Sequence, residues 1–354
     1  MTISKKHNII RDVPPLPPSS LFFSEESANP LDLGERGLEQ GADGSFFHNP
    51  VLLKKSVENL VVNSGGIYVD CTFGGGGHSR EILKNLSEKG KLFAFDQDLD
   101  ALKNTIDDER FTLINQNFRF LENALLMFGI SQVDGILADL GVSSHQFDEA
   151  ERGFSTRSNA PLDMRMNTKQ NLDAQKIINE YDEEALSDIF YHYGELKESR
   201  KLAREIVHHR KTRKIETTED LKKLFGYIPQ HRQNKFFAQL FQSVRIEVNQ
   251  ELEALKEMLV QAHRILKPGG RLVVISYHSL EDRLVKRFLK NGMFEGEPER
   301  DIFGNYKKTF ELLQSKATVP DDREIEENPR ARSAKMRVGS PLSPEGGKNG
   351  KNDV

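Results

Sequence analysis

The sequence predicts an α/β protein in which an open, largely parallel sheet is interrupted by a helical insertion. The first observation is that short apolar runs alternate with helix-compatible runs between residues 48 and 139. The second is that residues 147–244 contain no convincing core strand, and the third is that the α/β pattern returns after residue 244. Strands that alternate with helices imply parallel pairing and right-handed crossovers.

Before the insertion, the expected elements follow from apolar periodicity and from turn residues such as Lys89-Gly90. They are a helix over 48–62, a strand over 67–71, a helix over 79–86, a strand over 91–95, a helix over 99–106, a strand over 111–115, a helix from 118 to 128 and a strand over 133–137. Asp98 or a neighbour is expected to cap the helix over 99–106.

The insertion and the closing part are divided in the same way. We expect insertion helices over 173–181, 183–193, 197–211, 218–225 and 235–241, then a helix over 247–266, a strand over 271–277, a helix over 280–290 and an antiparallel pair within 308–319 and 333–338. This gives a discontinuous sheet domain over 45–146 and 245–338, with the insertion over 147–244. The polar, proline-rich residues 1–44 and the Gly/Lys-rich residues 339–354 are expected to be disordered.

Composition narrows the classes of function. Hydrophobic residues make up 37% and charged residues 29% of the chain, and no apolar run approaches the ~18 residues of a membrane helix. The N-terminus lacks the apolar core of an export signal. A single cysteine, Cys71, excludes an internal disulfide and a cysteine-based metal cage, and the histidines show no metal-ligand spacing. We therefore expect a cytoplasmic protein without a bound metal.

The first strand runs into four consecutive glycines, Gly74–Gly77, and then into a helix. Open α/β sheets build nucleotide pockets in this way. The dinucleotide pattern G-x-G-x-x-G fails, because Ser79 and Arg80 stand where the third glycine would be. Asp96 ends the second strand, where a carboxylate can accept hydrogen bonds from both ribose hydroxyls. The stretch favours a nucleoside without pyrophosphate, such as S-adenosylmethionine; the alternative is a tight turn with a helix cap.

Asp139 follows the fourth strand and should face the same crevice, since ligands bind outside the carboxyl ends of parallel strands. Acidic groups suit a sulfonium donor, although Asp139 could simply cap a turn. Cys71, the only candidate thiolate for attack on a cytosine ring, lies at the end of a buried strand and is interpreted as a core residue. A base substrate would therefore react through an exocyclic amine or a hydroxyl.

The insertion carries a local excess of positive charge in an otherwise acidic chain. Residues 197–214 contain eight Lys and Arg against two Glu. Arg200, Arg204, Lys211 and Arg213 are the candidates for contact with RNA. The alternative is a solvated helix face, which is the usual reason for a run of charges.

Seven motifs together resemble the MraW/RsmH methyltransferase family, and the resemblance covers about residues 46–338. The motifs are Phe47-His48-Asn49-Pro50-Val51-Leu52, Asp70-Cys71-Thr72-Phe73-Gly74-Gly75-Gly76-Gly77-His78-Ser79, Asp139-Leu140-Gly141-Val142-Ser143-Ser144, Glu151-Arg152-Gly153-Phe154-Ser155, Pro161-Leu162-Asp163-Met164-Arg165-Met166, Tyr277-His278-Ser279-Leu280-Glu281-Asp282-Arg283 and Asn328-Pro329-Arg330-Ala331-Arg332-Ser333. The resemblance implies a Rossmann-like, seven-stranded S-adenosylmethionine-dependent methyltransferase sheet with an inserted all-helical substrate-recognition domain. It also implies methylation of the exocyclic N4 amine of a cytosine in 16S ribosomal RNA of the small subunit.

The resemblance also suggests roles for individual residues. It implies a cofactor site made of Gly76, Gly77, His78, Asp96, Phe118, Asp139 and Gln146. We take Asp139 as the candidate catalytic acceptor for an amine proton, with Asp163, Tyr277 and His278 as weaker candidates for contact with the base. Taken alone, Phe118 would be a core residue and His78 a helix-start residue.

Other expectations concern partners and alternatives. The expected partner is 16S ribosomal RNA or the small subunit. The sequence leaves the oligomeric state open, with a homodimer as one option. Two features depart from relatives: His145 stands in place of a proline, and the N-terminal extension has no counterpart. The alternative functions are a nicotinamide-dependent oxidoreductase and a non-catalytic RNA-binding protein. The failed dinucleotide pattern speaks against the first. The intact set of Asp70, the glycines, Asp96 and Asp139 speaks against the second.

Overall fold

A computed structural model describes residues 50–304, 306 and 308–342 of the chain. The expected disorder of residues 1–44 lies outside the described residues, as do residues 343–354. The expected disordered tail is wrong for its first residues. The last strand runs over Lys335–Pro341, because Gly339 pairs with Leu272 on one side and Leu312 on the other.

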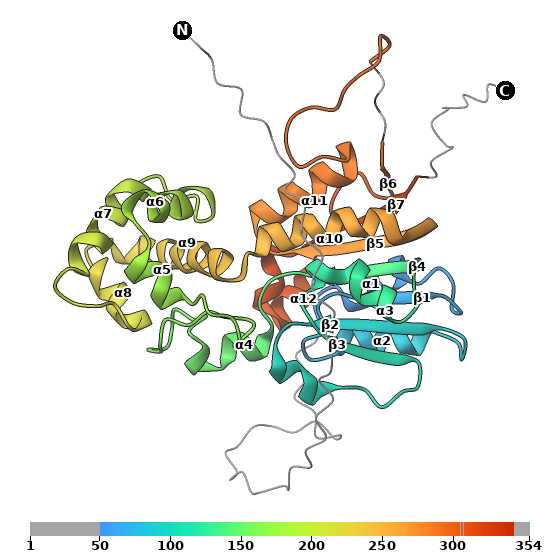
Figure 1. Cartoon of the computed structure of the whole chain (residues 1–354), viewed down its shortest axis with the longest axis horizontal. Helices are drawn as coiled ribbons and strands as arrows, with labels where there is room; N and C mark the ends of the chain where they lie inside the picture. Colours follow the sequence, from blue (N-terminus) through green and yellow to red (C-terminus); the bar gives the residue numbers. More distant parts are fainter. Residues whose placement is uncertain (1–49, 305, 307, 343–354) are drawn as a thin grey trace, which may run out of the picture. The chain divides into compact units, whose positions relative to one another are not determined.

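Seven strands form one sheet in the order β3-β2-β1-β4-β5-β7-β6 (Figure 1). Their bounds are β1 Ile67–Asp70, β2 Lys91–Asp96, β3 Phe111–Asn115, β4 Val133–Asp139, β5 Leu266–Ser276, β6 Phe310–Leu312 and β7 Lys335–Pro341. The first five strands are parallel, whereas β7 runs antiparallel to both β5 and β6. The predicted sheet and its closing antiparallel pair are thus confirmed.

Helices cover both faces of the sheet, so the central strands are buried on both sides. On one face Tyr68 packs with Leu60 and Ile82, which lie in α1 (Leu53–Leu60) and α2 (Gly77–Asn85). On the other face Val69 belongs to the cluster of α3 (Leu121–Met127), α10 (Glu251–Ile265) and α11 (Ser279–Asn291). Successive strand residues serve opposite faces, as strand geometry requires.

Shorter elements complete the sheet region. They are the 3₁₀ helices η1 (Leu99–Asn104), η2 (Phe118–Phe120) and η4 (Pro329–Ser333), and the helix α12 (Asp322–Glu327). Of these, α12 and η4 were not predicted from the sequence. Asp98 caps η1 as expected, but the turn is a 3₁₀ helix and ends before residue 106. β5 begins at Leu266 rather than at residue 271, because the strand continues through an irregular segment in which Gly269 has φ +80.

The insertion contains the helices α4 Ser144–Asp148, η3 Ala150–Arg152, α5 Ala174–Glu180, α6 Glu183–His192, α7 Ser199–His209, α8 Thr218–Leu224 and α9 Gln230–Asn249. No strand occurs among residues 147–244, all of which are described; one isolated bridge joins Pro161 to Thr217. The helices share a core of their own, which includes Phe190, Phe225 and Leu240. The expected helical character of this segment is confirmed.

The helices around residue 244 differ from expectation. The helix predicted over 235–241 extends from Gln230 to Asn249, and the next helix starts at Glu251 instead of residue 247. The predicted domain limit at 244/245 therefore falls inside α9. The chain breaks at Gln250, which has a left-handed backbone with φ 50 and ψ 41. An uncharged, non-glycine residue with positive φ leaves no local signal of a helix end.

None of the helices in the described part of the chain is long and apolar enough to cross a membrane.

Candidate active site

Three aspartates stand at the carboxyl ends of adjoining strands. Asp70 ends β1, Asp96 ends β2 and Asp139 ends β4, and β1 lies between the other two. The strand order reverses at β1, which is the place where open α/β sheets bind ligands. The sheet topology therefore brings the three aspartates together at the edge where the sequence predicts a ligand site.

Asp70 anchors the loop that follows β1. Its side chain is fully buried, and it accepts hydrogen bonds from the Ser79 hydroxyl at 2.7 Å and from the Thr72 N–H at 3.1 Å. Burial raises the pKa of this carboxyl, while the hydrogen bonds from Ser79 and Thr72 oppose that change. Because Ser79 belongs to α2, Asp70 fixes both ends of the glycine stretch. Cys71 beside it is buried in the core, as expected.

Two positions of the glycine stretch need glycine because of their backbone conformation, and a third needs it because of close packing. Gly74 and Gly76 have φ values of 51 and 77, in the left-handed region that favours glycine. A Cβ atom on Gly77 would lie 2.2 Å from Pro50 Cγ, whereas one on Gly75 would meet nothing within 4 Å. Gly75 thus faces open space, and Gly77 lets α2 approach the segment before α1.

Asp96 holds this loop from the side of β2. One carboxylate oxygen accepts the Gly74 N–H at 2.8 Å and the other accepts the Asp98 N–H at 2.8 Å. Each oxygen keeps a second lone pair, so acceptor capacity remains for a ligand. Burial raises the pKa of Asp96 to about 6, against the effect of the two backbone donors.

Asp139 is tied to two other segments by hydrogen bonds. Its Oδ1 accepts the Tyr277 hydroxyl at 2.8 Å, and its backbone N–H donates to Thr72 Oγ1 at 2.8 Å. Burial raises its pKa to about 8; the Tyr277 hydrogen bond acts against this, and the charges of Asp70 and Glu281 add to it. A positive charge placed beside Asp139 would favour its carboxylate form.

His78 lies at the start of α2, with Nδ1 3.7 Å from Asp139 Oδ2. Its side chain is 5% exposed, and burial lowers its pKa to about 4, so the ring is neutral at neutral pH. Nε2 is buried without a hydrogen-bond partner among the described residues. A hydrogen bond with the Val51 backbone opposes the lowering of the pKa and ties the ring to the segment before α1.

Gln146 is buried, and its amide makes one hydrogen bond through each of its polar atoms within the protein. Its Nε2 donates to Asp98 Oδ2 at 2.7 Å, and its Oε1 accepts the Ser143 N–H at 3.1 Å in the capping box of α4. The buried Arg152 guanidinium donates to the same Asp98 oxygen at 2.9 Å. Neither Arg152 nor Asp98 was predicted from the sequence as a site residue. Arg152 belongs to the motif Glu151-Arg152-Gly153-Phe154-Ser155, to which no role was assigned.

Phe118 lies in η2, directly after β3, where it is partly buried and packs against the core of α3 and α10. Its neighbour Asn117 donates from Nδ2 to Gln97 Oε1 at 2.8 Å, which links the ends of β3 and β2. Phe118 thus stands at the same edge of the sheet as the three aspartates.

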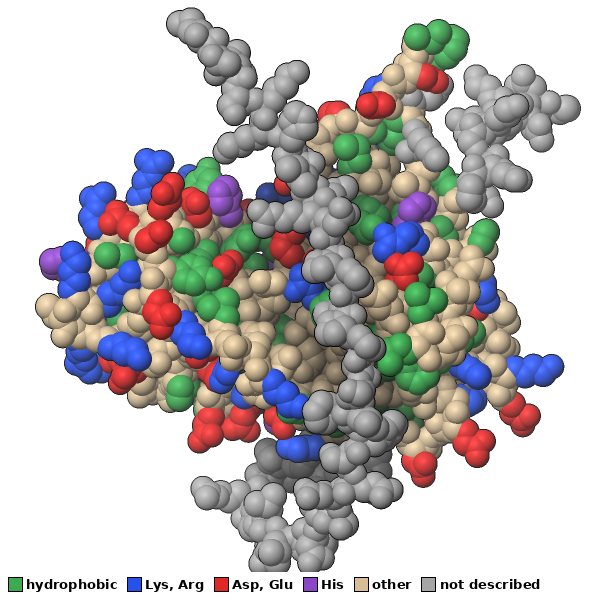
Figure 2. Space-filling view, in the orientation of Figure 1, with side chains coloured by type: hydrophobic (Ala, Val, Ile, Leu, Met, Phe, Trp, Pro, Cys, Tyr) green, Lys and Arg blue, Asp and Glu red, His purple; other side chains and the backbone are tan. Residues whose placement is uncertain are grey.

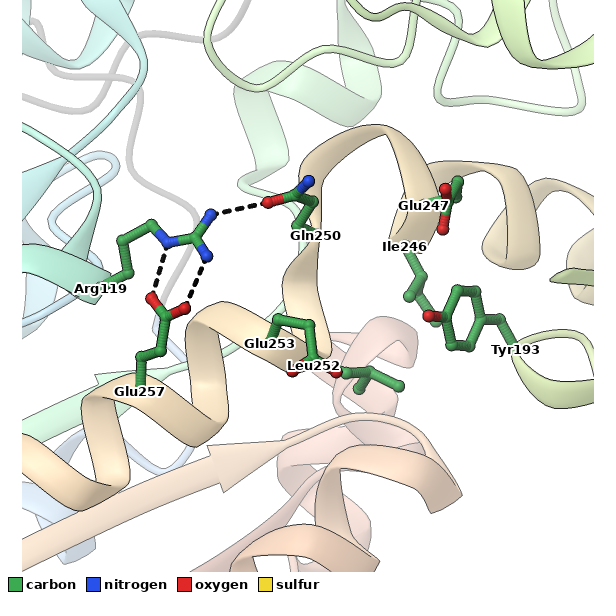
Figure 3. Close-up of a pocket in the computed structure, with 8 residues that line it drawn as sticks. All are labelled: Arg119, Tyr193, Ile246, Glu247, Gln250, Leu252, Glu253 and Glu257. Carbon is green, nitrogen blue, oxygen red and sulfur yellow. Dashed lines mark hydrogen bonds and ion pairs between the residues drawn. The ribbon is translucent and has the colours of Figure 1, made fainter. Parts of the chain in front are cut away.

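A separate cavity of about 240 Å³ lies where α9 meets α10 (Figure 3). Its lining residues are Arg119, Tyr193, Ile246, Glu247, Gln250, Leu252, Glu253 and Glu257. The Arg119 guanidinium donates two hydrogen bonds to Glu257 at 2.7 Å and one to Gln250 at 2.8 Å. Arg119 thereby ties η2 to α10 and to the residue that separates the two helices.

The four residues predicted to contact RNA are all exposed. Arg200 and Arg204 lie in α7, and Lys211 and Arg213 follow it. Figure 2 shows Lys and Arg side chains over this part of the insertion, mixed with acidic ones. Arg204 lies 3.4 Å from Glu183 and Arg213 lies 3.5 Å from Asp220, which reduces the net charge.

One basic residue counted in this cluster has a different role. The half-buried Arg210 guanidinium donates to the backbone carbonyls of Ile178, at 2.7 Å, and Tyr181. It joins the end of α7 to the end of α5 and is therefore structural.

Comparisons with known proteins agree over most of the chain. A family model described as the MraW methylase family matches residues 45–340. A protein of Flavobacterium johnsoniae named "Ribosomal RNA small subunit methyltransferase H" is 61% identical over 293 residues, covering 82% of this chain and 97% of that relative. A protein of the same name from Christiangramia forsetii is 59% identical over 297 residues, covering 84% of this chain and 98% of that relative.

Replacing Gly77 tests the packing of the glycine stretch. Gly77→Ala should lower the free energy of unfolding by about 1–3 kcal/mol, because its Cβ would collide with Pro50. Gly75→Ala is the matched control, since its Cβ meets open space. Thermal unfolding of both variants measures the difference, and an equal loss in both would contradict this account of the loop.

Proposed function

The chain belongs to the MraW methylase family, and from this premise we propose that it transfers a methyl group from S-adenosyl-L-methionine to the N4 amine of a cytosine in 16S ribosomal RNA. The observation that carries the proposal is the family match over residues 45–340, which includes the complete sheet and the insertion. The relatives that match nearly end to end are named as methyltransferases of small-subunit ribosomal RNA.

The residues present fit S-adenosylmethionine. The open space at Gly75 exposes backbone to a ligand, His78 Nε2 is buried without a protein partner, and Asp96 keeps free lone pairs. We assign the glycine loop, Gly76 and Gly77 included, and His78 to the donor's amino-acid end. Asp96 would accept hydrogen bonds from the ribose, and Phe118 would contact the adenine.

Gln146 has a less direct role in this proposal. Its amide is used by Ser143 and Asp98, so it would shape the donor site by holding the loop after β4 against the end of β2. Arg152 would support it, since it binds the same Asp98 carboxylate.

When bound, the donor supplies a methyl group on a positively charged sulfonium. The protein's contribution is to position and desolvate the two reactants. The cytosine amine is a weak nucleophile, because its lone pair is delocalised into the ring, so an acceptor for its proton assists the attack. Asp139 is that acceptor in our proposal: it lies in the crevice, and a neighbouring positive charge favours its ionised form.

The target cytosine must leave its stack to reach this crevice. The exposed basic residues of the insertion, Arg200, Arg204, Lys211 and Arg213, would contact RNA phosphates. A cytoplasmic location and a homodimer belong to the same proposal. Exposed apolar side chains around α3, namely Phe120, Leu126, Met127 and Phe128, offer a face for dimer formation.

Methyl transfer to small ribosomal subunits tests the function. Small subunits that lack the modification should acquire label from S-adenosylmethionine at a single cytosine, which mass spectrometry of RNA fragments would locate. Label on a base other than cytosine, or absence of label with intact subunits and correctly folded protein, would refute the proposal. Absence of label would favour the non-catalytic RNA-binding alternative.

Asp96→Asn tests the donor site. Affinity for S-adenosylmethionine should fall about tenfold or more, because each hydrogen bond to a charged acceptor contributes about 1.5–3 kcal/mol. The pKa of Asp96 is raised to about 6, so the native affinity should decline as the pH falls through about 6, where the carboxylate becomes protonated. The variant should lack this decline. Calorimetry at several pH values measures the affinity of the native protein and of the variant. Asp108→Asn, outside the crevice, is the control.

Charge reversal on the insertion tests the RNA surface. Arg204→Glu combined with Lys211→Glu should weaken RNA binding and flatten its dependence on salt, by up to about 0.7–0.9 in logarithmic slope for each lost phosphate contact. Lys84→Glu, an exposed residue of α2, is the control. Unchanged salt slopes in the double variant would show that these residues form a solvated helix face and do not bind RNA.

A further inference from the structure

Tyr277 connects Asp139 to the turn between β5 and α11. Its hydroxyl donates to Asp139 Oδ1 at 2.8 Å, and its backbone N–H donates to Glu281 Oε2 at 2.9 Å. Glu281 is 3% exposed, and its other oxygen lies 3.1 Å from His278 Nε2. The side chain that touches Asp139 is therefore held at its backbone by a buried carboxylate.

A second ion pair adjoins this turn from the insertion side. Arg245 of α9 donates from Nε and Nη2 to the two oxygens of Glu251, at 2.8 and 2.9 Å. Ligand atoms of Glu251, His278 and Glu281 all lie within 4.8 Å of one another. The spacing would suit a cation, but the Arg245 guanidinium already occupies both oxygens of Glu251. Arg245 therefore supplies the fixed positive charge of this group.

The charges of the group keep Glu281 ionised. Burial by itself would raise the pKa of Glu281, but His278, the Tyr277 N–H and the charge of Arg245 lower it below its ordinary value. An ionised carboxylate is the stronger acceptor for a backbone N–H. The last helix of the insertion and the first turn of α11 thus meet in one group of charges, of which Glu281 is buried and the others are partly buried.

We propose that Tyr277 is a positioning residue for methyl transfer, which orients Asp139 for the incoming amine, and that Glu281 and Arg245 hold Tyr277 in place. This inference rests on the proposed function, because it takes Asp139 as the proton acceptor. The hydroxyl of Tyr277 engages Oδ1 and so leaves Oδ2 for the amine proton. As the N–C bond forms, the C–S bond breaks with its electron pair passing to sulfur, and one amine proton passes to Asp139.

Four titratable groups face Asp139 and set its ionisation. Asp70 from β1 and Glu281 from α11 disfavour its carboxylate by their charge, and the His78 ring from α2 is neutral at neutral pH. The Tyr277 hydroxyl is the donor that favours the carboxylate. Loss of this hydroxyl should therefore move the ionisation of Asp139 to higher pH.

Tyr277→Phe is the primary test, in single-turnover methylation of small subunits over a range of pH. With S-adenosylmethionine at saturating concentration, we expect the rate at neutral pH to fall about tenfold to a hundredfold, with the rise in rate displaced to higher pH. A variant whose pH profile coincides with that of the native protein would overturn the proposal, whatever its rate. Absence of methylation by the native protein would instead refute the proposed function.

Glu281→Gln tests whether Glu281 acts through Tyr277. Its rate should fall, and the Glu281→Gln, Tyr277→Phe double variant should be no slower than Tyr277→Phe alone, since residues of one network are not additive. Independent, multiplicative losses would show that Glu281 does not act through Tyr277. Arg245→Lys, which keeps the charge but loses the two-pronged contact, should show a smaller loss in the same direction.

Asp282→Asn is the matched control. Asp282 is the next acidic residue in the first turn of α11, but it pairs with Arg337 of β7 at 2.6 Å and not with the Tyr277 turn. Its substitution should lower the thermal stability and leave the pH profile of the methylation rate unchanged. A displaced pH profile in this control would show that any disturbance of α11 has the same effect, and would overturn the proposal.

Discussion

The structure depends on how buried carboxylates are accommodated at one edge of the sheet. Asp70, Asp96 and Asp139 end three adjoining strands, and burial raises the pKa of each. Each is satisfied differently: Asp70 by a hydroxyl and a backbone N–H, Asp96 by two backbone N–H groups, and Asp139 by a tyrosine. Unpaired charges would be costly there, so the loops after the strands must take the conformations that supply donors.

The same requirement joins the insertion to the sheet. Arg152 places its guanidinium on Asp98, with side chains 10% and 5% exposed, and Arg245 pairs with Glu251 at the junction of α9 and α10. Removing one partner of a buried pair typically costs about 3–5 kcal/mol, because the other charge stays buried. These pairs thus tie the segment around Arg152 to the end of β2, and α9 to α10.

The glycine stretch illustrates how one feature serves both folding and binding. Gly74 and Gly76 take left-handed conformations, Gly77 lies against Pro50, and Gly75 faces open space. The two interpretations of this stretch, a nucleoside loop and a tight turn with a helix cap, are therefore compatible. The stretch forms a tight turn, and the backbone of that turn is exposed at Gly75, where a ligand can approach it.

The sequence by itself determined that the early strands are parallel, that the insertion is helical, and where the glycine loop and the three aspartates stand, because apolar periodicity and glycine clusters are local signals. The break at Gln250, the start of β5 at Leu266 and the structural role of Arg210 were decided by tertiary structure. So were the partners of Gln146 and the network from Arg245 to Tyr277. Several of the deciding contacts join residues far apart in the chain, such as Asp98 with Arg152 or Asp139 with Tyr277. Such contacts leave no pattern in a local window of sequence.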